Sequence, residues 1–254
     1  MKVALLQSDL VWENKMLNFL HFRNRISSME EKVDLIVLPE MFTTGFTMNA
    51  GILAEPTVAS TLLNMQEWAA YSDAAICGSF IAEERGRYFN RLLWVQPDGS
   101  YKYYDKKHLF GLADETKHYT AGKERLIVEW RGWRICPLIC YDLRFPVWSR
   151  NNHSYDLLLY IANFPTRRVH AWNSLLVARA IENQSYTIGV NRIGTDGMGI
   201  EYPGESCVID FEGKTLVRKA DEEAILYAEL DLSRQQIFRE NFPFLKDQDM
   251  FSIQ

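Results

Sequence analysis

The feature that most constrains the fold is an apolar stretch that ends abruptly at a cysteine. From Ile135 to Cys140 almost no side chain is polar, which is typical of a central strand covered on both faces. Residues 141–144 then mix polar and apolar side chains, and Phe145-Pro146 predicts a turn into a short helix. The sequence therefore places Cys140 at the end of a buried strand, where open α/β sheets carry reactive groups.

Strand and helix patterns alternate along the rest of the chain, which predicts mixed sheets. A sheet covered by helices on one face needs a partner for its other face. We therefore predict an α/β fold, a four-layer αββα sandwich of two mixed β-sheets between helical layers. The chain is expected to form a single domain, 1–254, in which 241–254 is a C-terminal tail with exposed aromatic residues. The predicted strands are 2–7, 34–39, 75–82, 88–95, 101–104, two within 126–140, 156–162, 186–191, 205–211, 215–217 and 224–230.

Helical periodicity predicts amphipathic helices at 14–31, 57–72, 168–185 and 232–240, and a short helix at 145–151. Residues 105–122 lack periodicity, so they form either a functional loop or a disordered one. The first of these helices has an apolar face formed by residues at helical spacing: Met16, Leu17, Phe19, Leu20, Phe22, Ile26 and Met29. The helix at 168–185 is expected to turn these side chains inward: Trp172, Leu175, Leu176, Ala178 and Ile181.

Composition excludes several classes of protein. The chain has 254 residues, 47% of them hydrophobic, and a formal net charge of -5. Its scattered Lys and Arg residues argue against nucleic-acid binding, and no apolar run is long enough to span a membrane. The first residues are typical of a strand rather than a signal peptide, so a cytoplasmic protein is expected. The four cysteines are too few and too scattered for a disulfide framework, and no zinc set surrounds Cys136 and Cys140.

Polar residues follow apolar strands at three points: Glu40, Lys106 and Cys140. A carboxylate, an amine and a thiol are what nucleophilic acyl transfer requires. The thiol attacks as thiolate, a poorly solvated carboxylate can accept its proton, and an ammonium group favours the thiolate and stabilises the oxyanion that forms. Taken singly, each of these residues is more often a loop charge or a packing residue.

Three blocks of sequence together resemble the signatures of the nitrilase superfamily of carbon–nitrogen hydrolases. They are Asp34-Leu-Ile-Val-Leu-Pro-Glu40-Met-Phe, Tyr104-Asp-Lys106-Lys-His108-Leu-Phe110 and Cys140-Tyr-Asp-Leu-Arg-Phe145. The resemblance implies that Glu40 is the general base, Lys106 rather than Lys107 the second catalytic residue, and Cys140 the nucleophile. It also implies that Glu115 orients Lys106 or the amine, that the Tyr141 amide donates to the oxyanion together with Lys106, and that no metal or other cofactor takes part. A homodimer formed through helices 145–151 and 168–185 is a further implication.

Three other segments resemble the ω-amidase branch: 142–146, 163–165 and 191–197. That branch hydrolyses the terminal amide of 2-oxo dicarboxylic acid monoamides such as 2-oxoglutaramate and 2-oxosuccinamate. A small-molecule substrate with a carboxylate needs a cationic partner, for which Arg144 is the candidate unless it pairs with Asp142 or Glu205. Phe164, with Phe46, Trp148 and Trp172, either walls the pocket or packs in the core.

Other interpretations stay open. Another amidase, an N-carbamoyl hydrolase or a nitrilase would use the same Glu-Lys-Cys chemistry. Cys140 could instead form a triad with His170 and Asn191, although nothing around His170 forms an active-site pattern. Metal hydrolysis is weaker still, because the histidines include no close pair on one helix face. A catalytically silent relative that binds a partner is the alternative outside the enzyme class.

Overall fold

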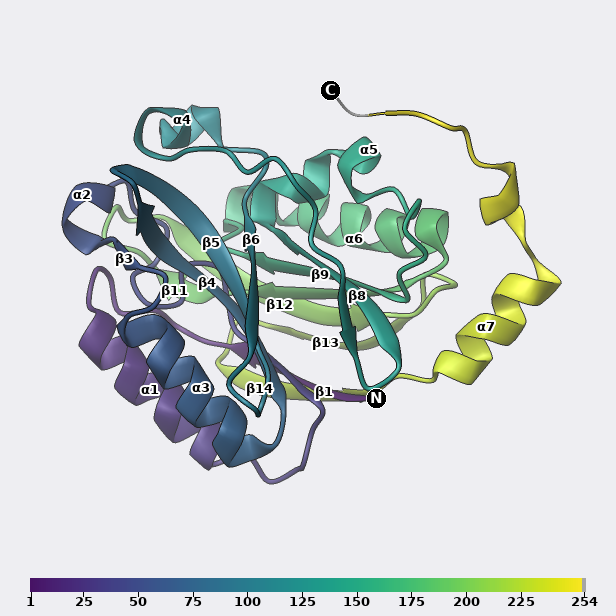
Figure 1. The fold of residues 1–254 in the computed structure, drawn as a ribbon, viewed down its shortest axis with the longest axis horizontal. Coiled ribbons are helices and arrows are strands. Elements are labelled where there is room, and N and C mark those ends of the chain that lie inside the picture. The colour runs from purple at the N-terminus through teal and green to yellow at the C-terminus, as the bar shows by residue number, and fades with distance from the viewer. Residues whose placement is uncertain (253–254) are drawn as a thin grey trace.

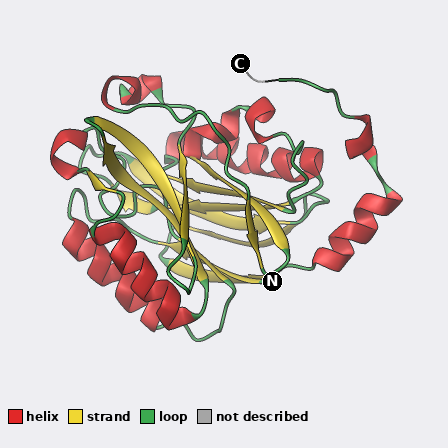
Figure 2. Cartoon of the chain, in the orientation of Figure 1, coloured by secondary structure: helices red, strands yellow, loops and turns green. Residues whose placement is uncertain are grey.

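Two seven-stranded sheets lie face to face at the centre of the molecule (Figure 1, Figure 2). The computed structural model describes residues 1–252. The first sheet has the order β14-β1-β2-β4-β5-β6, with β3 beside β4. Its strands are β1 (Lys2–Gln7), β2 (Leu35–Val37), β3 (Glu55–Pro56), β4 (Ala75–Glu84), β5 (Arg87–Val95), β6 (Tyr101–Asp105) and β14 (Ala224–Glu229).

The second sheet has the order β11-β12-β10-β9-β8-β7, with β13 beside β12. In both sheets a parallel centre, β1-β2-β4 or β8-β9-β10, is flanked by antiparallel strands, so both are mixed. The strands of the second sheet are β7 (Val128–Trp130), β8 (Trp133–Ile139), β9 (Leu157–Ala162), β10 (Tyr186–Asn191), β11 (Ile193–Thr195), β12 (Glu201–Ile209) and β13 (Thr215–Ala220).

Helices cover the outer faces of both sheets, which confirms the predicted four-layer sandwich (Figure 1). One outer layer is α1 (Lys15–Ser27) and α3 (Ser60–Ser72), and the other is α5 (Pro146–Ser149) and α6 (Val169–Asn183). The remaining helices are α2 (Ala50–Leu53), α4 (Glu115–His118) and α7 (Leu232–Asn241). Within residues 1–252, none of the helices combines the length and apolarity needed to cross a bilayer.

The alternation of side chains along β1 explains how the layers are joined. Val3 and Leu5 pack into the core between the two sheets, whereas Ala4 and Leu6 pack against the α1–α3 layer. Successive residues of a strand point to opposite faces, so a strand covered on both sides is apolar throughout. The same explanation holds for β8, whose continuous apolar run predicted a buried strand.

The predicted inward faces of two helices are partly wrong. Met16, Leu17 and Leu20 in α1 are 75%, 47% and 53% exposed, and Ile181 in α6 is 46% exposed. In α1 the buried stripe is Phe19, Phe22 and Ile26 with Asn18. Asn18 takes an inward position because its amide bonds the backbone oxygens of Val11 and Thr43. In α6 a buried Arg179 similarly donates to the Leu143 carbonyl. Hydrogen-bonded polar side chains therefore occupy positions that hydrophobicity alone assigns to apolar ones.

Other boundaries also differ from the predictions. The segment 105–122 is ordered, with a 3-10 turn at Gly111–Ala113 followed by α4. β3 and β11, of two and three residues, were not predicted, and β12 begins at Glu201 rather than Glu205. In the tail, Phe242 and Phe251 are exposed, whereas Phe244 is half-buried against Phe242. Residues 253–254 of the predicted tail lie outside the described residues.

Candidate active site

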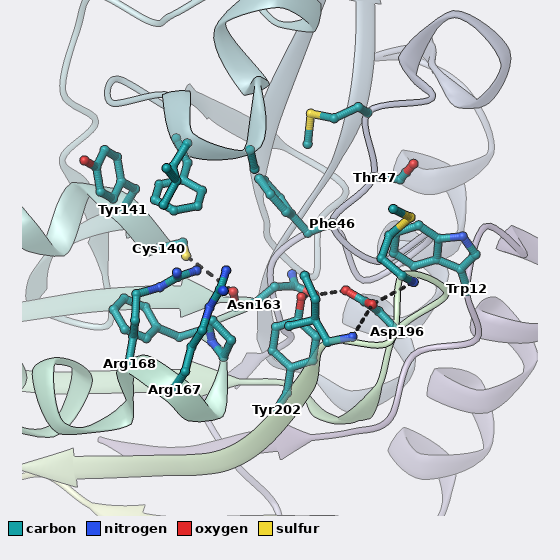
Figure 3. Close-up of a pocket in the computed structure, with 18 of the residues that line it drawn as sticks. Trp12, Phe46, Thr47, Cys140, Tyr141, Asn163, Arg167, Arg168, Asp196 and Tyr202 are labelled. Carbon is teal, nitrogen blue, oxygen red and sulfur yellow. Dashed lines mark hydrogen bonds between the residues drawn. The ribbon is translucent and has the colours of Figure 1, made fainter.

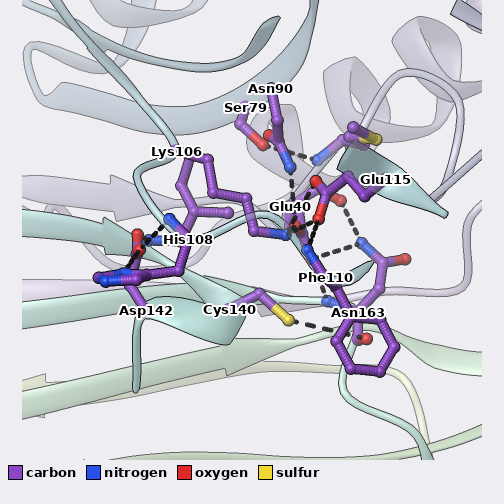
Figure 4. A network of polar contacts seen from close by, with 12 residues as sticks. Glu40, Ser79, Asn90, Lys106, His108, Phe110, Glu115, Cys140, Asp142 and Asn163 are labelled. Atoms are coloured by element: carbon purple, nitrogen blue, oxygen red, sulfur yellow. Dashed lines mark hydrogen bonds and ion pairs between the residues drawn. The ribbon is translucent and has the colours of Figure 1, made fainter. Parts of the chain in front are cut away.

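The ends of strands from both sheets meet at one place and bring four predicted residues together (Figure 4). Glu40 follows β2 of the first sheet, Lys106 follows β6, and Cys140 follows β8 of the second sheet. Glu115 is the first residue of α4. After α4 the chain returns to Lys106 at Gly122, whose amide donates to the Lys106 carbonyl at 2.9 Å. A Cβ at position 122 would lie 2.0 Å from the Asp105 carbonyl oxygen, so this approach requires glycine.

The Lys106 ammonium group lies between the two glutamates. Its Nζ donates to Glu40 Oε1 at 2.9 Å and to the Glu115 oxygens Oε1 and Oε2 at 3.1 and 3.0 Å. The side chains are 1% exposed for Lys106 and fully buried for both glutamates. Lys106 rather than Lys107 is the lysine that faces Glu40, because the Lys107 Nζ instead lies over the Trp148 ring.

Burial and charge act in opposite directions on Lys106 and Glu115. Burial lowers the pKa of Lys106, but the neighbouring Glu115 and Glu40 outweigh it and raise that pKa above its ordinary value. Burial raises the pKa of Glu115, Lys106 lowers it and Glu40 raises it, and the result lies above the ordinary value. The cluster therefore holds an ammonium group next to Glu115, a carboxylate that binds a proton more readily than usual.

Two asparagines that the sequence interpretation did not assign a role complete the contacts of Glu40. Asn90 Nδ2 donates to Glu40 Oε1 at 2.8 Å, and the Asn163 backbone N–H donates to Oε2 at 2.8 Å. Asn163 Nδ2 also donates to the Glu40 carbonyl at 2.7 Å, which ties the two sheets together at this edge. Asn163 directly follows the apolar strand β9, so the strand-end pattern that identified the other residues could have found it. No comparable signal marks Asn90, which lies inside β5.

Cys140 begins the 3-10 turn Cys140–Arg144 with a φ of +44°, a left-handed conformation that is rare for residues other than glycine. The turn leaves Cys140 partly exposed to a cavity, with Sγ 3.9 Å from the Asn163 carbonyl oxygen. Burial and the adjacent Glu40 raise the pKa of the thiol well above its ordinary value, and Lys106 only partly opposes them. These contacts favour the protonated thiol over the thiolate, so a base beside Cys140 is needed before the sulfur can attack.

The Tyr141 amide lies at the start of the same turn. The first N–H groups of a helical turn have no intrahelical acceptor, so this amide is available to a negatively charged oxygen near Cys140.

Asp142 joins the cysteine turn to the lysine segment. Its buried carboxylate accepts from the Tyr104 hydroxyl at 2.7 Å and from the Ile139 amide at 3.1 Å. It also accepts from the His108 amide at 3.0 Å, and His108 Nδ1 lies 2.7 Å away. Because Asp142 binds groups of both the cysteine turn and the lysine segment, it fixes the position of Cys140 relative to Lys106.

A cavity of about 440 Å³ opens onto Cys140 and Lys106 (Figure 3). Phe46 and Phe164 line it, as the sequence allowed, but Trp148 and Trp172 do not. Trp148 is buried and donates to the Tyr104 hydroxyl, and Trp172 is buried and donates to the Glu205 carbonyl. The wall opposite Cys140 includes Trp12, and in Figure 3 Phe46 lies between them.

Arg144 lines this cavity and makes neither of the ion pairs that the sequence left open. Asp142 is occupied by the groups described above, and Glu205 pairs with Arg218 at 3.2 Å. The Arg144 guanidinium lies 5.6 Å from the centre of the Phe164 ring. Two further arginines, Arg167 and Arg168, line the same cavity and were not predicted from the sequence.

The alternative triad of Cys140, His170 and Asn191 is wrong. His170 is exposed and does not line the cavity. Asn191 is buried and its side chain bonds the backbone of Phe164 and Gly204. Neither side chain contacts Cys140 in the described part of the chain.

Comparison with known proteins gives concordant results. The sequence model of the carbon–nitrogen hydrolase family matches residues 2–240. The chain is 49% identical to omega-amidase YafV of Yersinia enterocolitica, over all of this chain and 98% of that one. It is 32% identical to the 2-oxoglutaramate amidase of Bacillus subtilis, over 96% of both chains. A crystal structure of a CN-hydrolase superfamily protein from Xanthomonas campestris, with an arsenic adduct in its active site, superposes with a TM-score of 0.98. The two chains are 40% identical, over all of this chain and 99% of that one.

Proposed function

The chain belongs to the carbon–nitrogen hydrolase family, and on that premise we propose that it is an ω-amidase. The proposed reaction hydrolyses the terminal amide of 2-oxo dicarboxylic acid monoamides, such as 2-oxoglutaramate and 2-oxosuccinamate, to the 2-oxo diacid and ammonia. The relatives named omega-amidase and 2-oxoglutaramate amidase support this substrate class. The observation that carries the proposal is the meeting of Cys140, Lys106 and two buried glutamates at a cavity lined by arginines.

The first half of the reaction forms a thioester. Cys140 Sγ attacks the amide carbon, and its proton passes to Glu40. The raised pKa of the thiol suits this order, because the proton leaves as the carbon–sulfur bond forms rather than beforehand. The carbonyl oxygen becomes an oxyanion, which the Lys106 ammonium and the Tyr141 amide stabilise. Glu40 then gives the proton to the nitrogen, the carbon–nitrogen bond breaks and ammonia leaves.

The second half releases the acid. Glu40 accepts a proton from the attacking water, whose oxygen adds to the thioester carbon. The carbon–sulfur bond breaks, the diacid leaves and Cys140 recovers its proton. Glu115 accepts two hydrogen bonds from the Lys106 ammonium group and so fixes its position. Asn90 and the Asn163 amide hold the Glu40 carboxylate through both halves.

Arg144 is the proposed partner of the substrate carboxylate, and Phe164 is the wall on which Arg144 lies. A guanidinium group binds a carboxylate through two parallel hydrogen bonds, and an unpaired carboxylate in this cavity would be costly. The homodimer, the cytoplasmic location and the single-domain organisation with its tail stay predictions.

The test is ammonia release over a panel of substrates: 2-oxoglutaramate, 2-oxosuccinamate, glutamine, a nitrile and an N-carbamoyl amino acid. The two 2-oxo amides should have the highest kcat/KM. Mass spectrometry of the intact protein should detect an acyl adduct that is absent from Cys140→Ala. Faster turnover of the nitrile or the carbamoyl compound would overturn the proposed substrate class while leaving the thiol chemistry in place.

A further inference from the structure

Three guanidinium groups face one cavity in a chain whose net charge is negative. Arg144, Arg167 and Arg168 all line the pocket that opens onto Cys140. Within residues 1–252, no carboxylate oxygen lies within 4.0 Å of any of these three guanidinium groups. Arg144 lies over the Phe164 ring, and Arg168 lies 4.9 Å from the centre of the Phe110 ring. Figure 3 shows Arg167 and Arg168 extending toward the region of Cys140 and Asn163.

The acidic residues that line the same pocket are already occupied elsewhere. Glu13 accepts from Thr47 and Asn49, and Asp196 accepts from the Tyr202 hydroxyl at 2.8 Å and from two backbone amides. Glu40 and Glu115 are bound to Lys106. The donors to Glu13 and Asp196 are all neutral groups, and neither carboxylate pairs directly with Arg144, Arg167 or Arg168.

The arginines also act on one another. Burial, Arg167 and Arg144 all lower the pKa of Arg168, while Cys140 opposes them. Arg168 is half-buried and Arg167 is exposed, so solvent and salt screen the charge of Arg168 less than that of Arg167. Cations held this close together repel one another until an anion binds, and they repel any ligand that brings a further positive charge.

One carboxylate needs only one guanidinium group for a bidentate contact, so the substrate carboxylate does not account for the other two. We propose that Arg167 and Arg168 form with Arg144 a charge filter that admits 2-oxo amides and rejects 2-amino amides. This inference rests on the proposed function. 2-Oxoglutaramate and glutamine share the terminal amide, the chain length and the carboxylate, and they differ only at C2. The carbonyl group of the first carries no charge, whereas the ammonium group of the second is repelled by the guanidinium groups.

The experiment measures kcat/KM at neutral pH for three amides that differ only at C2: 2-oxoglutaramate, glutaric acid monoamide and glutamine. The variants are Arg168→Gln and Arg167→Gln. The matched control is Arg23→Gln, which removes the same charge from an exposed position on α1 outside the pocket. We expect Arg168→Gln to lower the 2-oxoglutaramate-to-glutamine ratio roughly tenfold and Arg167→Gln roughly threefold, as for loss of a partly screened like-charge contact. Arg23→Gln should leave the ratio unchanged.

The comparison with glutaric acid monoamide separates repulsion from simple binding. The filter predicts that the monoamide-to-glutamine ratio also falls in Arg168→Gln, and that added salt lowers this ratio in the wild-type protein more than in the variant. An equal loss for all three amides would show that Arg168 serves only the shared carboxylate, and would overturn the filter. A loss confined to 2-oxoglutaramate would make Arg168 a hydrogen-bond donor to the carbonyl, and would overturn it too. Failure of the proposed function is a different result, because the wild-type protein would then release no ammonia from 2-oxoglutaramate.

Discussion

Replacement of Lys106 by methionine should destabilise the protein in a way that depends on pH. The change removes three hydrogen bonds, of 2.9 to 3.1 Å, from two fully buried carboxylates. Removing one partner of a buried ion pair typically costs about 3–5 kcal/mol. Lys106, Glu40 and Glu115 together carry a net charge of minus one, and the two glutamates can limit the cost of losing Lys106 by binding one proton, which restores that charge.

The free energy needed to bind that proton sets the size of the destabilisation at each pH. Protonating a glutamate of ordinary pKa costs about 3.7 kcal/mol at pH 7 and about 1 kcal/mol at pH 5. In the variant the folded chain binds this proton more tightly than the unfolded chain does. The stabilisation is therefore present below the unfolded pKa and lost as the pH rises through the folded pKa. Glu115 is the group expected to take the proton, because burial already raises its pKa in the native protein.

Urea denaturation at pH 7 and pH 5 measures the effect as a difference in the free energy of unfolding. We expect Lys106→Met to lose about 4 kcal/mol at pH 7 and about 1 kcal/mol at pH 5, and to be inactive at both. The control is Lys107→Met, because Lys107 is half-buried over Trp148 and pairs with no carboxylate in the described residues. An equal loss at the two pH values, or an equal loss in the two variants, would refute the assignment of Lys106 as the counter-ion of both glutamates.

Three further predictions concern the nucleophile, its turn and the substrate carboxylate. Cys140→Ala should abolish turnover, while Cys136→Ala should affect stability only. Iodoacetamide labelling of Cys140 should accelerate above pH 9, because burial and Glu40 raise the pKa of the thiol. Rapid labelling that is already maximal at pH 7 would contradict this. Asp142→Asn should lower the free energy of unfolding by about 2–3 kcal/mol and lower kcat, because an amide cannot accept from all four groups that donate to the carboxylate. An unchanged kcat would show that the contacts of Asp142 with Tyr104 and His108 do not position Cys140. Arg144→Met should raise KM for 2-oxoglutaramate roughly ten- to a hundredfold, as for loss of a charged hydrogen bond, and should change KM for an uncharged short amide little. An equal rise in KM for both substrates would show that Arg144 supports the turn after Cys140 instead.

The sequence by itself determined the strand order along the chain and the reactive residues at the strand ends. β1 was predicted with its exact bounds, and β8 and β9 nearly so, because a strand buried on both faces leaves a continuous apolar run that needs no partner to be recognised. Glu40 and Cys140 could be identified because each polar side chain follows such a run, whereas Lys106 follows the mixed and largely exposed strand β6. The three signature blocks then gave these residues their expected roles.

Only the tertiary structure decided which polar groups complete the site. The contact between Asn163 and Glu40 spans 123 positions and joins the two sheets, and no local pattern encodes that distance. The arginine cluster likewise depends on where the segment after β9 folds over the cavity. The inward faces of α1 and α6 were misjudged because buried hydrogen bonds of Asn18 and Arg179 offset the cost of burying polar side chains. Periodicity records which residues avoid water, whereas the partners that satisfy a buried polar group come from elsewhere in the chain and appear only when it is folded.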